Sequence, residues 1–363
     1  MSPILSKEET LSRVVIALTG DIYPTRPLTP LPAEVRAVFD ILRNADVAVG
    51  NFEISLTDKG APLEKLLAIR ANPEVVRDLP ELGLDVVTVA NNHAIDYGWD
   101  ALRDSMDRLQ ATGLRVVGAG STVAEAMQPT VVTVDGARIG IIAFSCLLPA
   151  GMAAAPNRPG LSPIHVHSAY EIDSTYQMEE PGELAIVKVR TWPDDSDLRS
   201  ACDAVRSLKS DCDFAIVSIH WGFGSGEQLA DYQWPVARAL IDAGADAIHG
   251  HHPHAIHPVG YYCGKPVLFS PNVLVGQQVF LPASPQVQKM WSEMSTDGYV
   301  ACLVLTGQGV EIELAPIVLD SDRLPRHALG ADRRRIFERL ERLSKAHGAR
   351  ITDNGERIAV MPS

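Results

Sequence analysis

Short apolar runs alternate with amphipathic stretches in the first third of the chain. The runs have the length and composition of buried strands, and the stretches between them repeat their apolar residues at helical spacing. Strands are predicted at 13–19, 46–49, 85–90 and 115–117, and helices at 33–43 and 99–111. This succession of strand, turn and helix is typical of a layered α/β fold, in which functional loops follow the strand ends.

The rest of the chain mixes such units with antiparallel pairs. Asp135 and Gly136 lie between two β-rich runs and predict a tight hairpin turn. Helices are predicted at 198–209 and 228–243, and strands at 213–219, 245–248, 256–262, 266–269, 299–305 and 310–315. We therefore expect mixed sheets.

Two segments differ from this pattern. Residues 147–196 show no periodicity and are rich in Pro, Gly and acidic residues, which is typical of a functional or mobile loop. After Asp320 the composition shifts, and residues 331–347 predict a charged helix that ends at Gly348. We expect one domain over 1–320 and a C-terminal basic helical extension over 321–363.

The overall charge limits the partners of the protein. The chain has 32 Lys and Arg against 45 Asp and Glu, so its net charge is 32 − 45 = −13. Such a chain lacks the positive field that nonspecific binding to nucleic acid or anionic membranes requires. Glutamates interleave the Arg-rich helix around 333–335, which favours a solvated face or a contact between copies in a homo-oligomer.

Other features of the sequence limit the class of protein and its compartment. Hydrophobic residues make up 46% of the chain, which excludes general disorder. No apolar run has the length of a membrane span, and the N-terminus lacks the pattern of a signal peptide. The five cysteines are scattered and predict neither a disulfide framework nor a cysteine-rich zinc site. We expect a cytoplasmic protein.

A dense histidine cluster, IHGHHPHAIHP, follows one predicted strand and contains five of the 11 histidines. Imidazoles spaced H-x-H at a strand end can point into one cavity and bind a transition metal. A solvated His-rich loop is the alternative, but the density of the cluster favours metal binding. His249 is expected within the strand and His257 within the next one, so only some of the five would be ligands.

Ligand-capable residues also follow four other predicted strands: Asp21, Glu53, the Asn91-Asn92-His93 run and His220. Each alone fits an ordinary turn or helix cap. Together with the H-x-H they supply the oxygen and nitrogen ligands of a binuclear hydrolytic site. The set therefore predicts one or two divalent transition ions.

Seven sequence blocks make the chain recognisable. They are GDIYPTR (20–26), GNFEISLTDKG (50–60), IRANPE (69–74), VVTVANNHAIDYG (86–98), VVGAGST (116–122), VSIHWG (217–222) and the stretch 239–272. In content and order they resemble the CapA/PgsA family of poly-γ-glutamate capsule-biosynthesis proteins, within the calcineurin-like metallophosphoesterase superfamily. The resemblance covers about residues 12–320. It implies a four-layer α/β/β/α sandwich with mixed sheets and metals at the carboxyl ends of strands.

The resemblance also implies a ligand set: Asp21, Glu53, Asn92, His220, His252 and His254. Glu53 would bridge the two ions, Asp21 would hold the first, and Asn92 with His220 would hold the second. His251 lies close enough to the H-x-H to leave its register open. Mn, Fe and Zn are all compatible with such ligands.

Catalytic and substrate-binding roles follow from the same resemblance. A metal-bound hydroxide would attack the substrate, and His93 would give a proton to the leaving group. Asp96 could orient His93 or cap a helix. Arg26 and Arg70 match family positions and are candidates to anchor a carboxylate or phosphate, with structural salt bridges as the alternative.

The chain departs from the wider superfamily at its first motif. The usual D-x-H is Asp21-Ile22-Tyr23, which leaves a weaker first metal site, a mononuclear site, or a metal approached by Tyr23. Three functions remain open. They are a cytoplasmic metal-dependent hydrolase of a small anionic substrate, a role in poly-γ-glutamate synthesis or turnover, and a non-catalytic binding protein.

The intact ligand set favours the hydrolase over the binding protein, and the missing export signal disfavours the capsule role. Only two arginines lie near the motifs, with Lys59 and Lys65 as remote candidates. A phosphate dianion usually needs more donors than these. We therefore expect a carboxylate-containing substrate cleaved at a carbon centre, with residues 147–196 as a lid that sets specificity.

Overall fold

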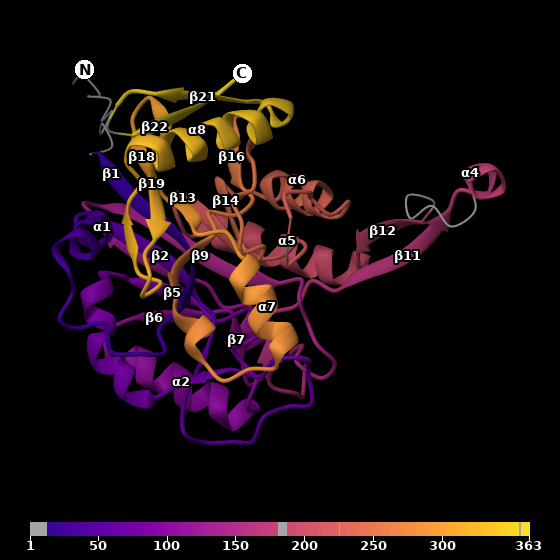
Figure 1. The fold of residues 1–363 in the computed structure, drawn as a ribbon, viewed down its shortest axis with the longest axis horizontal. Helices are drawn as coiled ribbons and strands as arrows, with labels where there is room; N and C mark the ends of the chain where they lie inside the picture. Colours follow the sequence, from indigo (N-terminus) through magenta and orange to yellow (C-terminus); the bar gives the residue numbers. More distant parts are fainter. Residues whose placement is uncertain (1–12, 181–186, 225, 356) are drawn as a thin grey trace, which may run out of the picture.

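Two mixed β-sheets stacked face to face form the centre of the protein (Figure 1). The structure is a computed structural model that describes residues 13–180, 187–224, 226–355 and 357–363. The first sheet has ten strands. Its main path runs β21 (Ala349–Asp353), β22 (Ile358–Pro362), β19 (Gly309–Leu319), β18 (Asp297–Thr306), β1 (Val14–Tyr23), β2 (Val47–Phe52), β5 (Val86–Thr88) and β6 (Arg115–Val117).

Two strands lie off this path: β17 (Val273–Gly276) pairs with β1, and β20 (Pro325–His327) pairs with β19. The second sheet has six strands. Their order is β15 (Val259–Tyr262), β16 (Lys265–Leu268), β14 (Ala247–His251), β13 (Phe214–His220), β9 (Ala137–Ser145) and β8 (Thr130–Val134). Both sheets are mixed, as the sequence predicts.

Helices cover the outer face of each sheet. The ten-stranded sheet is covered by α1 (Ala33–Arg43), the 3₁₀ helix η1 (Pro73–Leu82) and α2 (Trp99–Ala111), and the six-stranded sheet by α5 (Asp195–Ser210) and α6 (Gln233–Asp242). Strand β1 shows how the sequence makes these layers. Ile16 and Leu18 point into the core between the sheets, whereas Ala17 faces the helices. The predicted four-layer α/β/β/α architecture is confirmed.

Short elements complete the body. They are α3 (Val123–Ala126), α7 (Pro285–Glu293), the 3₁₀ helices η3 (Gln277–Phe280) and η4 (Lys345–His347), and the strand pairs β3 (Ser55–Leu56) with β4 (Arg70–Ala71) and β7 (Ala119–Gly120) with β10 (Gly160–Leu161). None of the described helices is long and apolar enough to cross a membrane.

The C-terminal segment contains more than the predicted helix. Helix α8 (Gly330–Ser344) buries Ile336 and Leu340 in the core between the sheets, and β22 extends the ten-stranded sheet by pairing with β19. Two of the clustered arginines form ion pairs within the protein. Arg333 lies 2.6 Å from Asp353, and Arg335 lies 2.5 Å from Asp297.

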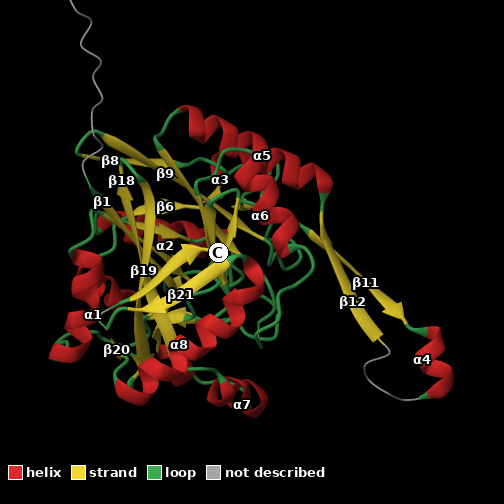
Figure 2. Cartoon of the chain, turned by 90° about the horizontal axis from the view of Figure 1, so that it is seen from above, coloured by secondary structure: helices red, strands yellow, loops and turns green. Residues whose placement is uncertain are grey.

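The prediction of an irregular 147–196 loop is wrong in its second half. Strands β11 (Val166–Ile172) and β12 (Val187–Pro193) pair antiparallel into an arm that projects from the body, with α4 (Ser174–Glu179) near its tip (Figures 1 and 2). Most residues of the two strands are exposed. Because such strands do not alternate buried and solvated positions, the sequence pattern did not reveal them.

Candidate metal centre

The parallel strands of both sheets bring the predicted ligands to one edge. Strand β1 runs parallel to β2, with Asp21 opposite Asn51, and β13 runs parallel to β14, with His220 opposite His251. The two sheets are joined near this edge, where Nε2 of the strand residue His249 lies 2.8 Å from the carbonyl oxygen of Thr19. The strand ends of both sheets therefore face one site.

Gly20 lets two backbones meet directly beneath this site. A Cβ atom at Gly20 would lie 1.5 Å from the carbonyl oxygen of Asn272 and 2.7 Å from its carbon. The same oxygen accepts a hydrogen bond from the backbone N–H of Asp21 at 3.2 Å. Only glycine fits here without moving the strand that carries Asp21.

Gly20→Ala is expected to lower the free energy of unfolding by at least about 1–3 kcal/mol, the usual cost of overpacking, because the obstacle is backbone. Thermal denaturation followed by circular dichroism measures this loss. Gly307→Ala is the matched control, since a Cβ there meets no atom within 4 Å. Equal stability of the two variants would contradict the close approach.

Six side chains form two groups whose ligand atoms lie within 4.8 Å of one another: Asp21, His220 and His251, and Glu53, His252 and His254. The two groups are in contact. His254 Nδ1 lies 3.2 Å from Asp21 Oδ2, and His220 Nε2 lies 3.3 Å from Glu53 Oε1. Asn92 Oδ1 lies 2.7 Å from the same His220 nitrogen. Every ligand implied by the resemblance is thus brought together.

Three buried atoms of this cluster form no hydrogen bond among the described residues: Glu53 Oε1, His252 Nδ1 and His254 Nδ1. Leaving such polar atoms buried and unpaired costs about 1–3 kcal/mol each. All three are atoms of types that bind metals, and the mixed carboxylate and imidazole set suits Mn, Fe or Zn. The residues present therefore fit one or two divalent transition ions.

The protonation states fit the same conclusion. Burial and the neighbouring histidines hold the pKa of His220 well below its usual value, and burial together with His254 lowers the pKa of His252 to about 3. Both rings are neutral at pH 7, which is the form that binds metals. Burial and the charge of Asp21 raise the pKa of Glu53 well above its usual range, and a bound cation would oppose that shift.

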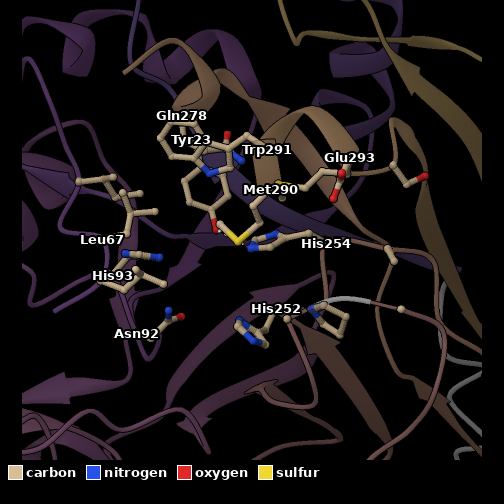
Figure 3. Close-up of a pocket in the computed structure, with 18 of the residues that line it drawn as sticks. Tyr23, Leu67, Asn92, His93, His252, His254, Gln278, Met290, Trp291 and Glu293 are labelled. Carbon is tan, nitrogen blue, oxygen red and sulfur yellow. Dashed lines mark hydrogen bonds between the residues drawn. The ribbon is translucent and has the colours of Figure 1, made fainter. Parts of the chain in front are cut away.

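His251 and His252 face different ways. His251 lies behind His220, with its Nδ1 2.8 Å from His220 Nδ1 and its Nε2 3.1 Å from the hydroxyl of Ser218. Its Nδ1 is also 4.0 Å from Asp21 Oδ1. His252 and His254 instead line the open cavity (Figure 3). This geometry favours the H-x-H pair as the ligands that face the cavity and leaves His251 in contact with His220; the assignment of ligands stays a prediction.

The backbone at the H-x-H pair is strained. His252 has a φ of 104° and His254 a φ of 49°, both in the left-handed region that favours glycine. The sharp turns at these two positions direct both rings toward the carboxylates of Asp21 and Glu53.

His93 lies at the cavity end of a chain of polar contacts. Its Nδ1 is 2.8 Å from Asp96 Oδ2, and the other oxygen of Asp96 is 2.5 Å from Lys65 Nζ. Asp96 therefore orients His93, whereas helix α2 begins after Gly98 without a side-chain cap. Burial lowers the pKa of His93, and its contact with Asp96 opposes that shift. The prediction that Lys65 is remote from the site is wrong.

Tyr23 occupies the place of the missing histidine in the first motif. Its side chain is buried, and its hydroxyl lies 3.3 Å from His254 Nε2. Burial and the carboxylates of Glu53 and Asp21 raise the pKa of Tyr23 well above its usual value. Of the three alternatives left open by the sequence, the approach of Tyr23 to the ligand cluster is the one the geometry supports.

Two asparagines link the ligand-bearing loops, and the sequence analysis missed this role. Asn51 Nδ2 donates to Asp21 Oδ1 at 2.7 Å and to Glu53 Oε2 at 2.8 Å. Asn91 Nδ2 donates to Asn51 Oδ1 at 2.9 Å, and Asn91 Oδ1 accepts from the backbone N–H of His93. The available signal was their position: Asn51 lies two residues before Glu53 and Asn91 directly before Asn92, which a turn explains equally well.

The cluster opens into a cavity of about 690 Å³ (Figure 3). Its wall comes from the ligand loops, from residues 65–67, from α7 and from Arg339 of α8. None of the described residues in 147–196 lines it, so the geometry gives no support to the prediction that this segment is a lid. Helix α7 was not predicted, although Ser284 caps it and Pro285 begins it.

Neither predicted substrate anchor lines the cavity. The Arg26 guanidinium lies 3.6 Å from the ring centre of Phe280, and that of Arg70 lies 4.7 Å from the ring centre of Tyr97. Both arginines are exposed and stack on an aromatic ring. Lys59 likewise lies outside the lining and pairs with Asp104 at 2.7 Å. The anchor roles of Arg26 and Arg70 stay predictions without support from the geometry.

Curated relatives resemble most of the chain. A Mycobacterium tuberculosis protein named "Probable polyglutamine synthesis accessory protein" is 28% identical over 340 residues, covering 91% of this chain and 82% of the relative. The capsule biosynthesis protein CapA of Bacillus anthracis is 27% identical over 272 residues, covering 72% of this chain and 59% of the relative. The PGA biosynthesis protein CapA of Bacillus subtilis is 29% identical over 233 residues, covering 63% of this chain and 53% of the relative.

Solved structures show more distant likenesses. A phosphatase from Mycoplasma pneumoniae aligns with a TM-score of 0.47 and 14% identity, covering 85% of this chain and 94% of that chain. The NAD nucleotidase of Haemophilus influenzae aligns with a TM-score of 0.44 and 12% identity, covering 91% of this chain and 63% of that chain.

The family comparison matches residues 15–276, which contain every predicted metal ligand and His93. The matched family is described as the bacterial capsule synthesis protein PGA_cap. This match spans well over half of the chain, and it agrees with the resemblance that the sequence blocks indicate. The chain belongs to the PGA_cap family of bacterial capsule synthesis proteins.

Proposed function

We propose that the protein is a metal-dependent hydrolase of a small substrate that carries an anionic group. One observation carries this proposal: a single cavity is lined by His93, which contacts Asp96, and by the predicted metal ligands Asn92, His252 and His254. The ions would be held by Asp21, Glu53, Asn92, His220, His252 and His254. Ions bound there would activate a water and polarise the bond to be cleaved.

The chain itself supplies the proton for the leaving group. Asp96 holds His93 through Nδ1, which leaves Nε2 as the nitrogen that can exchange a proton with a substrate. Lys65 and the backbone N–H of Ile69, 2.8 Å from Asp96 Oδ2, hold the carboxylate in place. His93 is thus positioned to protonate the departing atom as the bond breaks.

The charges of the cavity favour a substrate of low charge. Each described cation of its lining is paired: Lys65 with Asp96 at 2.5 Å, Lys289 with Glu293 at 3.9 Å, and Arg339 with Glu227 at 3.3 Å. A phosphate dianion usually requires several donors beyond the metals. This supports a carboxylate-bearing substrate cleaved at a carbon centre, such as an amide, over a phosphate monoester.

The names of the relatives favour a second candidate within the same chemistry. Three of them are named for polyglutamine synthesis, for PGA biosynthesis or for capsule biosynthesis. A hydrolase that trims or releases a γ-glutamyl amide would serve such a process. The cytoplasmic location, the lack of nucleic-acid and membrane partners and a homo-oligomeric state stay predictions.

Activity measurements on the full chain test the proposal. Protein stripped of metal and reloaded with Mn, Fe or Zn is assayed against γ-glutamyl amides, other N-acyl amino acids and p-nitrophenyl phosphate esters. We expect turnover of an amide that disappears with chelator and returns with metal. Turnover restricted to the phosphate esters would reject the carbon-centre assignment, and no metal-dependent turnover of any class would reject the hydrolase.

A further inference from the structure

The cavity has two chemically different halves. The inner half holds the polar side chains of the metal centre, including Asn92, His93, His252 and His254. Apolar side chains from two other segments form much of the remaining wall, which we call the outer half: Leu66, Leu67, Met290, Trp291 and Met294. Figure 3 shows Leu67 and Met290 pointing into the same space as His93 and His254.

The mouth of the cavity exposes large apolar side chains. Leu66 is 74% exposed and Met290 is 43% exposed, and they come from two segments far apart in the chain. Both line the cavity, as does the almost completely buried Trp291 beside Met290. Apolar side chains that gather around a polar reaction site are typical of a surface that binds the apolar part of a ligand.

The charged residues of the outer half also favour an uncharged substrate group there. The outer half also contains Lys289, Glu293, Glu227 and Arg339, which pair with one another as described above. A substrate with a carboxylate on every residue would find no described lining cation without an acidic partner. An uncharged group that follows the anionic one along the cavity would lose no ion pair and would cover the exposed Leu66 and Met290.

We propose that the outer half of the cavity is a subsite for an alkyl or aryl group of the substrate, next to the anionic group bound at the metal centre. The substrate is then an amphiphile, such as an N-acyl or aryl-substituted carboxylate, and not a polyanion. The cleavage of that substrate rests on the proposed function, whereas its binding does not.

Binding of simple carboxylates to the metal-loaded full chain tests the subsite by isothermal titration calorimetry. Butyrate, octanoate and suberate are the probes, because suberate has the length of octanoate with a second carboxylate at the far end. Burying methylene groups contributes up to about 0.8 kcal/mol each, so octanoate is expected to bind at least about tenfold more tightly than butyrate. Suberate is expected to lose that gain.

Substitutions at the mouth of the cavity test whether its apolar side chains cause the difference in affinity between octanoate and butyrate. Leu66→Gln combined with Met290→Gln is expected to reduce the octanoate-to-butyrate ratio to about threefold or less, since both changes keep a side chain of similar size but replace its apolar end with an amide. Leu329→Gln is the matched control, because Leu329 is 71% exposed but lies outside the cavity lining. It is expected to leave the ratio unchanged.

The outcomes separate the subsite from the hydrolase. Equal affinities for butyrate and octanoate, no measurable binding of any probe, tight binding of suberate, or a ratio unaffected by the double variant would each overturn the subsite, even in an active enzyme. A length dependence that the double variant removes supports the subsite, even where every hydrolysis assay fails.

Discussion

His252→Ala combined with His254→Ala is expected to abolish metal binding while the fold is retained. The two rings line the cavity beside Glu53 and Asp21, and His254 Nδ1 lies 3.2 Å from Asp21 Oδ2. Without them the site loses two of its three predicted histidine ligands, which leaves His220 as the only predicted ring-nitrogen ligand beside the buried carboxylates. Elemental analysis of protein purified without chelator should find metal in the wild type and little or none in the variant.

Thermal denaturation gives a second measure of the same change. A metal at 100 times its dissociation constant stabilises the folded state by about 2.7 kcal/mol, which is about 3 °C for a chain of this length. The wild type should show this rise and the double variant should not. The control is His165→Ala with His167→Ala, a half-exposed H-x-H pair in which His165 contacts Asp197 and His167 contacts Asp194. Loss of metal from the control, or retention by the test variant, would contradict the assigned centre.

His93→Gln is expected to lower kcat by about 10²–10⁴-fold without loss of metal, the usual contribution of a positioned proton donor. Glutamine can still reach Asp96 by hydrogen bonding but cannot give up a proton at neutral pH. The decrease should appear in kcat more than in KM, because the proton moves in the transition state. Steady-state kinetics on whichever amide is turned over, together with metal analysis, measures both effects.

Two comparisons make this result specific. His167→Gln makes the same chemical change at a histidine that also contacts an aspartate, Asp194 at 3.2 Å, but lies outside the cavity lining. It should leave kcat unchanged. A His93→Gln enzyme of full activity would show that His93 is not the proton donor, and a variant without metal would show that it supports the ligands.

The strand ends and the ligands could be predicted because their signals are local. Gly-Asp, Gly-Asn-x-Glu and H-x-H each lie within a few residues of a buried apolar run, and parallel strands place their carboxyl ends at one edge. Asn92 and His220 come from different sheets, yet the order of the blocks was enough to associate them. The structure brings their side chains to 2.7 Å.

The remaining features depend on contacts between distant segments. Asn51 and Asn91 acquire their role only when their side chains meet across β2 and the 91–97 turn. Helix α7 is short, and its importance comes from facing residues 65–67 across the cavity. Arg26 and Arg70 were assigned to the substrate because guanidinium groups suit anions, but aromatic rings also bind them, and sequence alone does not separate these partners.

The left-handed backbone at His252 and His254 bears on how this chain would evolve. Holding two non-glycine residues there costs on the order of 1–3 kcal/mol each, and glycine at either position would relieve that cost. A protein that had lost its chemistry would gain stability by drifting toward glycine or asparagine at both positions. The cost of holding two histidines in this conformation therefore fits the proposed role of both rings as metal ligands.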